Sequence, residues 1–391
     1  MAMRRWGFSE NRDIISDLPQ SLIGDILTKL PIRDAVRTSI LSSRWRYQWT
    51  NMTELVFNSK CVNRPYTLDK LVNCMMPCLL LHDGHIHKFK LCIPPMGNSP
   101  GIDQCLLFLS RRGIKELDLR VDIEVLGPPA PGERQLVHTA IFSCQQLTRL
   151  TLCGLVVQPP PNCRGFPCLK HLSLDLCTVT LEVIENLISG SPFLESFEID
   201  YNDDQLALTV NAPNLKHLTM AGTFRDVYLE HTPLLVVVSV NFISQAWEGD
   251  VFMKLPTTYN DLKFIKAMGV NFQEMNEASL FHHLILHAPN LEKLQISAVP
   301  IGYPQGNAAD LDVWDEEGLA DFKFRNLKSV KMWDVSNEYD IEFIKFVLGR
   351  SPVLQMISIS LEEDCIGKLG MVNQVLHFRR ASPEVDIVFF D

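Results

Sequence analysis

The sequence of 391 residues has no apolar run of about eighteen residues, the length that a helix needs to cross the hydrocarbon core of a membrane. Its opening residues, MAMRRWGFSENRD, lack the apolar core of a secretory signal. These two absences predict a protein that neither spans nor contacts a membrane.

Motifs of familiar catalytic sites are missing as well. The sequence has no glycine-rich phosphate-binding loop, no H-E-x-x-H and no G-x-S-x-G. Histidines and cysteines gather between residues 74 and 92, but without the paired spacing of a zinc site. We therefore expect no enzymatic activity, no metal and no cofactor.

A regular cysteine framework is absent, although the chain has eleven cysteines. In a chain of this size, that pattern indicates reduced thiols rather than disulfides, and so a location in the nucleus, the cytoplasm or both.

Clustered positive charge is scarce. The net charge is −10 and is unevenly distributed, because residues 1–60 hold nine basic and six acidic residues whereas the remainder holds 27 basic and 40 acidic. An acidic body of this kind disfavours phosphate-backbone binding, so no nucleic-acid partner is expected.

What the sequence does contain is a dense helical signal at residues 13–53. Pro19 and Pro31 bound a stripe of apolar residues with helical period. Asp17 is a candidate cap for this helix. Pro31 ends the helix, because a proline disfavours the α conformation of the residue before it.

Two further short helices are predicted in the same stretch, one from Ile32 and one over RWRYQW at residues 44–49. So short a segment carries more apolar side chains than its own interior needs. This indicates a docking module that completes its burial against a partner.

The same stretch resembles an F-box of the plant F-box/FBD/leucine-rich-repeat family. The matching pieces are D-x-I-S-x-L-P at 13–19, I-L at 26–27, L-P-I-x-D-A-V-R-T-S at 30–39 and L-S-x-R-W-R-x-x-W at 41–49. Gln48 departs from the family pattern, which has an apolar residue there. The resemblance implies binding to a Skp-type adaptor and, through it, to a cullin and a RING protein. It assigns eight residues to adaptor contact or its immediate support: Leu18, Pro19, Ile26, Leu30, Pro31, Leu41, Trp45 and Trp49.

A repeated apolar pattern follows, in which a second apolar residue stands three positions after the first and a third stands two positions later. Clear copies begin at Leu147, Leu169, Leu194, Leu215, Leu235, Leu291, Leu327 and Leu354, and weaker ones at Ile86, Ile114 and Leu262. From Leu147 to Leu235 the steps are 22, 25, 21 and 20 residues, which is typical of leucine-rich repeats. The predicted fold is α/β: a three-helix F-box, then an irregular leucine-rich-repeat solenoid with a curved parallel sheet, ending in an FBD region.

Helices are predicted between some of these strands. TLEVIENLISG offers Thr180 as a cap and Gly190 as a stop, and DIEFIKFVLG repeats the plan with Asp340 and Gly349.

The free positions of each repeat are expected on the concave side of the sheet, because strand side chains alternate between its two faces. Solenoids commonly bind partners there, although solvation alone explains any single polar residue. Trp333 stands out because exposed tryptophans are frequent hot spots, but a neighbouring loop would also accommodate it. The candidate target-binding residues are Arg149, His171, Asp175, Glu198, Asp200, His217, Lys293, Lys331 and Trp333.

The last segment, residues 322–391, resembles the FBD domain of the same family. The matching pieces are FRNLKSVKM, FIKFVLGRSPVLQMISI and FRRASPEVDIVF. The expected organisation is a flexible N-terminus at 1–12, an F-box at 13–53, leucine-rich repeats at 54–321 and an FBD region at 322–391 that continues the solenoid.

The resemblance implies the substrate-recognition subunit of a Skp-cullin-F-box ubiquitin ligase, with an F-box that docks the adaptor and a body that holds an unknown target protein. Two alternatives share the same signature. One is a ligand-sensing F-box receptor with a small molecule in a concave pocket, and the other is a non-degradative scaffold that binds the adaptor. The concave row shows no obvious cluster of lysine and arginine, which disfavours a polyphosphate ligand.

Overall fold

The structure is a computed structural model. It describes residues 15, 18–94, 100–122, 135–136, 139–161, 163–202, 207–223, 226–242, 253–254, 258–299, 314, 322–363 and 367–390. The chain divides into two compact units, Met1–Cys144 and Gln145–Asp391.

The first unit begins with the predicted short helices. Helix α1 (Gln20–Thr28) starts directly after Pro19, and α2 (Ile32–Arg37) starts directly after Pro31 and continues into the 3-10 helix η1 (Thr38–Ile40). These two helices confirm the proline-bounded pattern. The candidate cap Asp17 lies outside the described residues.

The predicted third helix over residues 44–49 is wrong. Residues 43–47 form turns, and only the 3-10 helix η2 (Gln48–Asn51) follows. Tyr47 explains the difference, because its φ of 65° is a left-handed conformation that interrupts a right-handed helix.

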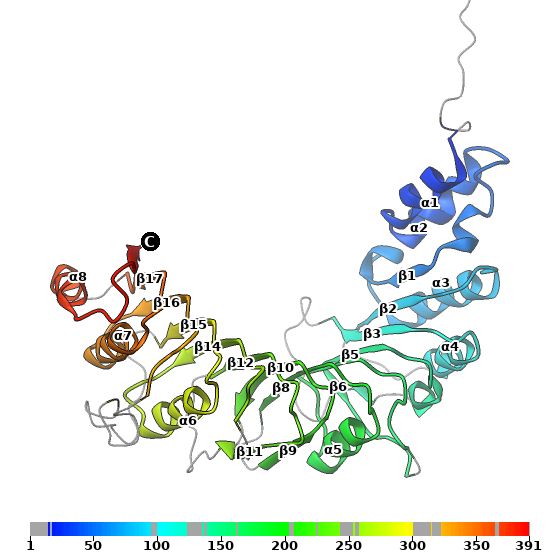
Figure 1. The fold of residues 1–391 in the computed structure, drawn as a ribbon. Helices are drawn as coiled ribbons and strands as arrows, with labels where there is room; N and C mark the ends of the chain where they lie inside the picture. The colour runs from blue at the N-terminus through cyan, green and yellow to red at the C-terminus, as the bar shows by residue number, and fades with distance from the viewer. Residues whose placement is uncertain are drawn as a thin grey trace, which may run out of the picture. The chain divides into compact units, whose positions relative to one another are not determined.

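The remainder of the first unit is a parallel sheet in the order β1-β2-β3, backed by helices (Figure 1). The elements are β1 (Glu54–Phe57), η3 (Ser59–Cys61), α3 (Leu68–Leu80), β2 (Lys88–Ile93), α4 (Pro100–Arg111), β3 (Glu116–Val121), β4 (Gln135–Leu136) and η4 (Thr139–Ser143). Phe57 and Phe89 point to the buried face and pack with their ring centroids 5.6 Å apart. The weaker repeat copies that begin at Ile86 and Ile114 form strands β2 and β3.

The second unit is built on parallel strands in the order β5-β7-β8-β10-β12-β14-β15-β16-β17-β18. Their bounds are β5 (Arg149–Cys153), β7 (His171–Asp175), β8 (Ser196–Asn202), β10 (His217–Thr223), β12 (Val237–Asn241), β14 (Phe264–Val270), β15 (Lys293–Ala298), β16 (Ser329–Val335), β17 (Met356–Leu361) and β18 (Asp386–Phe389). All of these strands except β18 carry the last two apolar positions of one repeat copy, and in each of these copies both side chains are buried. The repeated pattern therefore specifies the sheet, and the fold is an α/β solenoid.

Helices and a second, smaller sheet cover the buried face of these strands. The helices are α5 (Leu181–Ser189), α6 (Met275–Leu286), α7 (Glu338–Arg350) and α8 (Lys368–His377). Strands β9 (Ala207–Asn211), β11 (Asp226–Glu230) and β13 (Met253–Lys254) form the smaller parallel sheet, and β9 lies beside α5 (Figure 1). A short strand, β6 (Leu155–Val156), follows β5.

This second sheet was not predicted, and repeat length accounts for part of it. The repeats that begin at Leu194 and Leu215 advance by only 21 and 20 residues, whereas those that contain α5 and α7 advance by 25 and 27. A short return strand fits the shorter repeats, which have few residues left for a helix of 9 to 13 residues.

The two predicted helix termini differ in detail from the structure. Helix α7 begins at Glu338, and its cap is Asn337, which forms a reciprocal capping box with Asp340. Thr180 precedes α5 but makes no side-chain cap. Gly190 follows α5 as predicted. A larger residue does not fit there, because a Cβ atom would lie 2.1 Å from the Arg164 carbonyl oxygen.

Candidate functional site

The first candidate surface is the exterior of the helical segment at the start of the first unit. Helix α1 turns Ile23 and Leu27 inward, while Leu22 and Ile26 remain 46% and 39% exposed. Leu22 and Ile26 are four residues apart and therefore share one side of the helix. The helix thus has two apolar sides, of which the segment itself covers one.

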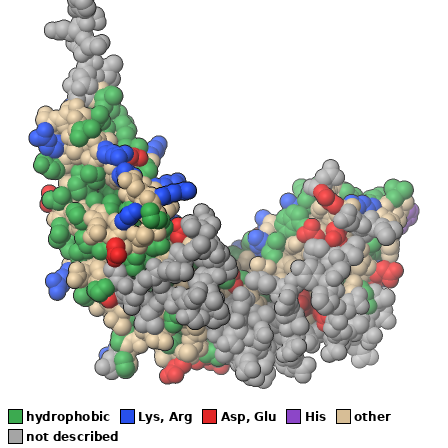
Figure 2. Space-filling model, turned by 180° about the vertical axis from the view of Figure 1, so that it is seen from behind, with side chains coloured by type: hydrophobic (Ala, Val, Ile, Leu, Met, Phe, Trp, Pro, Cys, Tyr) green, Lys and Arg blue, Asp and Glu red, His purple; other side chains and the backbone are tan. Residues whose placement is uncertain are grey.

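A second group of exposed apolar side chains lies before α1 and after α2. Ile40 is 86% exposed and Leu41 is 58% exposed, and Ile15 and Tyr47 are more than half exposed. Burial of an apolar side chain is worth about 1.5–3 kcal/mol, so leaving four of this size in water is unfavourable for a free monomer. Figure 2 shows hydrophobic side chains interspersed with Lys and Arg on this part of the first unit.

The two tryptophans lie in the interior of this segment. Trp45 and Trp49 are 2% and 3% exposed, and the Trp45 indole Nε1–H donates a hydrogen bond of 3.1 Å to the carbonyl oxygen of Ile15. They therefore support the packing of this segment from its interior.

Gln48 has a structural explanation in this segment. Its side-chain amide donates a 2.9 Å hydrogen bond to the Arg44 carbonyl, and its amide oxygen accepts a hydrogen bond from the side chain of Gln20 at the start of α1. The polar residue thus connects η2 to α1.

The second candidate surface is the sheet face opposite the helices. In the second unit the pairing registers align its side chains into rows that run across the strands, and these registers place Asp175 beside Asp200 and Gln295 beside Lys331. We call this surface the strand face. Its described members between β5 and β8 are Arg149, Thr151, Cys153, His171, Ser173, Asp175, Ser196, Glu198 and Asp200.

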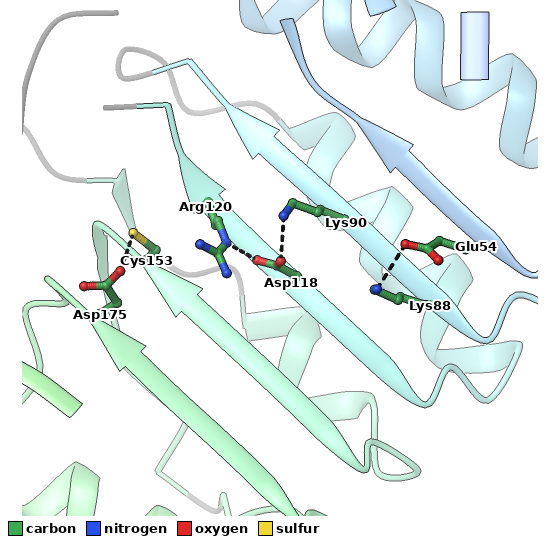
Figure 3. A network of polar contacts seen from close by, with 7 residues as sticks. All are labelled: Glu54, Lys88, Lys90, Asp118, Arg120, Cys153 and Asp175. Atoms are coloured by element: carbon green, nitrogen blue, oxygen red, sulfur yellow. Dashed lines mark hydrogen bonds and ion pairs between the residues drawn. The ribbon is translucent and has the colours of Figure 1, made fainter. Parts of the chain in front are cut away.

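On the first unit, the corresponding face carries ion pairs between strands (Figure 3). Lys88 Nζ lies 3.1 Å from Glu54 Oε1, and Lys90 Nζ lies 3.2 Å from Asp118 Oδ2. Arg120 Nε donates a 2.6 Å hydrogen bond to the other oxygen of Asp118. Each of these three cations therefore has a carboxylate partner.

The strand face from β7 to β10 is acidic, and His171 and His217 lie at its border. Asp175 and Asp200 are in register, and the Cys153 thiol donates a 3.4 Å hydrogen bond to Asp175 Oδ2 (Figure 3). Burial and the nearby charge of Asp175 raise the pKa of Asp200. His171 lies two rows away, where burial and Arg149 lower its pKa.

The strand face from β14 to β16 is basic and aromatic. Lys331 Nζ lies 4.7 Å from the centroid of the Trp333 ring and 4.6 Å from that of Phe390. Lys293 Nζ lies 5.1 Å from the centroid of the Phe264 ring. Such cation–π contacts are worth about 0.5–1 kcal/mol at exposed sites and orient an ammonium group without neutralising it.

Lysines where the strands begin are paired with carboxylates instead. Glu195 bridges Lys170 and Lys216 at 2.9 and 3.0 Å, and these two lysines lower its pKa to about 2. Glu292 similarly lies between Lys263 and Lys328, at 3.3 and 3.2 Å.

Comparison with known proteins shows the family of the chain. The F-box domain family model matches residues 15–56, and the model described as the LRR repeats of FBD-associated F-box protein At5g56370 matches residues 102–251. The F-box/FBD/LRR-repeat protein At1g13570 of Arabidopsis thaliana is 39% identical, and the match covers 97% of this chain and 99% of that protein. The chain belongs to the F-box/FBD/LRR-repeat family.

Two further proteins are similar to this chain. The FBD-associated F-box protein At4g10400 of Arabidopsis thaliana is 25% identical, with 92% of this chain and 80% of that protein covered. Among solved structures, an internalin from Listeria monocytogenes is 12% identical with a TM-score of 0.38, covering 82% of this chain and 94% of that chain. At that score, the likeness adds nothing to the repeat pattern already described.

The F-box match contains the whole helical segment, from Ile15 to η2. Six of the eight residues that the sequence assigned to adaptor contact or its support have partly or well exposed side chains: Leu18, Pro19, Ile26, Leu30, Pro31 and Leu41. Trp45 and Trp49 lie in the interior. Adaptor contact by any of these residues stays a prediction.

Sequence reasoning left out four exposed apolar residues of the F-box: Ile15, Leu22, Ile40 and Tyr47. Leu22 was recognisable, because it stands four residues after Leu18 and four before Ile26. Ile40 was not, because the 3-10 helix that turns it outward has no apolar period of its own.

The predicted target-binding residues all lie on strands of the second unit, at positions outside the buried core, but they do not form one cluster. The acidic part holds His171, Asp175, Glu198, Asp200 and His217, and Arg149 lies beside it on β5. Lys293, Lys331 and Trp333 belong to the basic and aromatic part. The expectation that this face has no basic cluster is wrong, because the registers also bring Lys266 of β14 into the row of Lys331. The weak repeat copy at Leu262 obscured this lysine.

Among the residues that the structure describes, no helix is long and apolar enough to cross a membrane. No group of three or more potential metal-ligating side chains comes together within the same residues.

Proposed function

We propose that this F-box/FBD/LRR-repeat protein is the substrate-recognition subunit of a Skp-cullin-F-box ubiquitin ligase. The F-box docks a Skp-type adaptor, and the LRR and FBD body holds a target protein. The observation that supports this most directly is the exposed apolar exterior of the F-box, because Leu22, Ile26, Ile40 and Leu41 project from a segment whose interior is already filled by Trp45 and Trp49.

In this role the protein performs no chemistry of its own. Its contribution is proximity: a target held on the strand face remains near the charged conjugating enzyme that the cullin and RING proteins bring. Binding both proteins to one complex raises their effective concentration for each other, even when each contact is modest. The outer surface of the F-box and the strand face use different residues, so adaptor and target do not compete for the same side chains.

The test is co-purification of the full-length chain with a plant Skp-type adaptor, followed by gel filtration. We expect a stable one-to-one complex from the wild-type chain. A variant with Ile40→Ser and Leu41→Ser should elute alone, whereas Lys345→Glu, on the exposed side of α7, should bind as the wild type does. If a known F-box protein captures the adaptor in parallel and the wild-type chain does not, the proposal is wrong.

Ubiquitination is tested separately, because a scaffold without ligase activity would also bind the adaptor. The complex is reconstituted with cullin, RING protein and conjugating enzyme, and ubiquitin transfer to captured plant proteins is followed. We expect transfer that requires the chain. Adaptor binding without any transfer would favour the scaffold function.

A further inference from the structure

We propose that the strand face from β14 to β16 binds an acidic, apolar-containing peptide segment of the target protein. The inference rests on the proposed function, because it treats this face as the surface that holds the target. The residues that carry it are Lys266, Lys293 and Lys331, together with the apolar side chains beside them.

The three lysines form a compact cationic cluster. Lys266 and Lys331 are in register with Gln295, which lies between them on β15, so their Cα atoms are two strand spacings apart, or about 10 Å. Lys293 stands two residues before Gln295, about 7 Å along the same strand and on the same face. An extended peptide spaces alternate side chains by about 7 Å as well, so two of its carboxylates can reach two of these ammonium groups at once.

These three lysines have no ion-pair partner among the described carboxylates. In that respect they differ from Lys88 and Lys90 on the first unit and from the lysines that flank Glu195 and Glu292. A chain with a net charge of −10 thus places three lysines that have no ion-pair partner in its described part together on one face. The two carboxylates that border the cluster are Asp334, which accepts a 2.8 Å hydrogen bond from Ser297, and Asp386 of β18.

Apolar surface adjoins the cluster. Met356 is 46% exposed and lies in register with Ser329, and Val388 is 43% exposed and lies in register with Ser358. The Trp333 indole N–H has no hydrogen-bond partner in the described part of the chain, so it is available to a peptide carbonyl or carboxylate. Uncompensated cations, an available donor and exposed aliphatic side chains together match a segment that alternates acidic and apolar residues.

A single-stranded nucleic acid is the competing ligand, because lysines interleaved with aromatic rings also bind bases. The charges favour a peptide. Three cations bordered by Asp334 and Asp386 suffice for two or three carboxylates, but phosphate-backbone binding depends on many cations along a track.

The test measures fluorescence anisotropy of labelled peptides with the full-length chain purified as its adaptor complex. The probe is Gly-Glu-Leu-Glu-Phe-Glu-Leu-Glu-Gly, and the comparison peptides replace every Glu with Gln, with Lys or with phosphoserine. We expect the Glu peptide to bind at least about tenfold more tightly than the Gln or Lys peptides, and to weaken as salt is raised from about 0.05 to 0.5 M.

The decisive variant combines Lys266→Glu, Lys293→Glu and Lys331→Glu and should weaken the Glu peptide by at least about tenfold. The matched control, Lys345→Glu on the opposite side of the sheet, should change the affinity by less than about twofold. If the charge-reversal variant does not fold, as judged by circular dichroism, the triple Lys→Gln variant replaces it, with the same direction expected.

Equal binding of the Glu and Gln peptides, unchanged affinity in the triple variant, binding of the phosphoserine peptide alone, or tighter binding of a ten-nucleotide oligouridine would each overturn the inference. Adaptor capture by the same preparations separates it from the proposed function. Capture without peptide discrimination overturns the inference alone. Peptide discrimination by a chain that captures no adaptor overturns the ligase function and leaves the peptide-binding face supported.

Discussion

Replacement of Ile40 and Leu41 with serine should nearly abolish adaptor binding while leaving the protein folded. Ile40 is 86% exposed and Leu41 is 58% exposed in the free chain. Full burial of such a side chain is worth about 1.5–3 kcal/mol, so covering the exposed parts contributes about 2 kcal/mol for Ile40 and about 1 kcal/mol for Leu41. Losing both contributions weakens the complex by about 3 kcal/mol, or about a hundredfold in Kd.

The stability of the free chain should change little, because neither side chain is buried. Exposed substitutions usually alter the free energy of unfolding by about 0.5 kcal/mol or less. The two effects are therefore separable: thermal unfolding is followed by circular dichroism, and adaptor affinity is measured by isothermal titration calorimetry on the same preparations.

An affinity within about threefold of the wild type would refute the reasoning, because it would mean that the adaptor does not cover η1. A large drop in melting temperature would refute it differently, by showing that these residues stabilise the F-box itself. Leu107, which is exposed on α4, supplies a control: Leu107→Ser removes a similar side chain from outside the F-box match and should leave adaptor affinity unchanged.

Three further predictions concern binding, stability and pH. Replacing Leu18 and Pro19 with Ala should weaken adaptor binding by about 2–4 kcal/mol in calorimetric titrations, and an unchanged affinity would exclude the start of α1 from the interface. Trp45→Ala should lower the free energy of unfolding of the first unit by about 3–5 kcal/mol in urea titrations followed by circular dichroism, because it empties a buried site, and a loss below about 1 kcal/mol would contradict the interior position. Burial raises the pKa of Asp340 to about 7 from 3.8, so the folded chain binds the extra proton between these values and the free energy of unfolding should fall as pH rises from 4 to 7. Asp340→Asn keeps the acceptor oxygen for two backbone N–H groups and should flatten that slope in calorimetric melts, whereas an unchanged slope would assign the pH dependence to other groups.

Much of the sheet could be predicted from the sequence, because its apolar period is local. Leu150 and Leu152 stand two positions apart and so must share one face of a strand, and the same spacing recurs in every copy up to Ile357 and Ile359. Even the weak copy at Ile114 yields a strand, since Leu117 and Leu119 are both buried.

The layer behind the sheet was less predictable. Strands β9 and β11 occupy positions where a helix was the alternative, and the choice depends on how many residues remain for the return path and on which neighbours they meet. Leu208 and Val210 alternate with Thr209, but such a short alternation specifies a strand only when a neighbouring strand pairs with it.

The candidate surfaces show the same division between local and non-local information. Trp45 and Trp49 looked equally suited to contact or to support, and only the packed segment shows that both rings are inside. The lysine cluster was hidden for a different reason. Lys266, Lys293 and Lys331 are at least 27 residues apart in sequence, and only the register between strands brings them together.

The alternation along each strand also affects how such proteins diversify. Inward side chains such as Leu294 and Met332 hold the scaffold, while outward neighbours such as Gln295 and Lys331 contribute little to it. Outward positions can therefore vary independently of the interior, one strand at a time, and each change alters a single point of contact with a bound partner. A small repertoire of outward residues on a fixed frame is enough to generate receptors with different preferences, and exchanging the outward residues of β14 to β16 between two such chains should exchange their ligands.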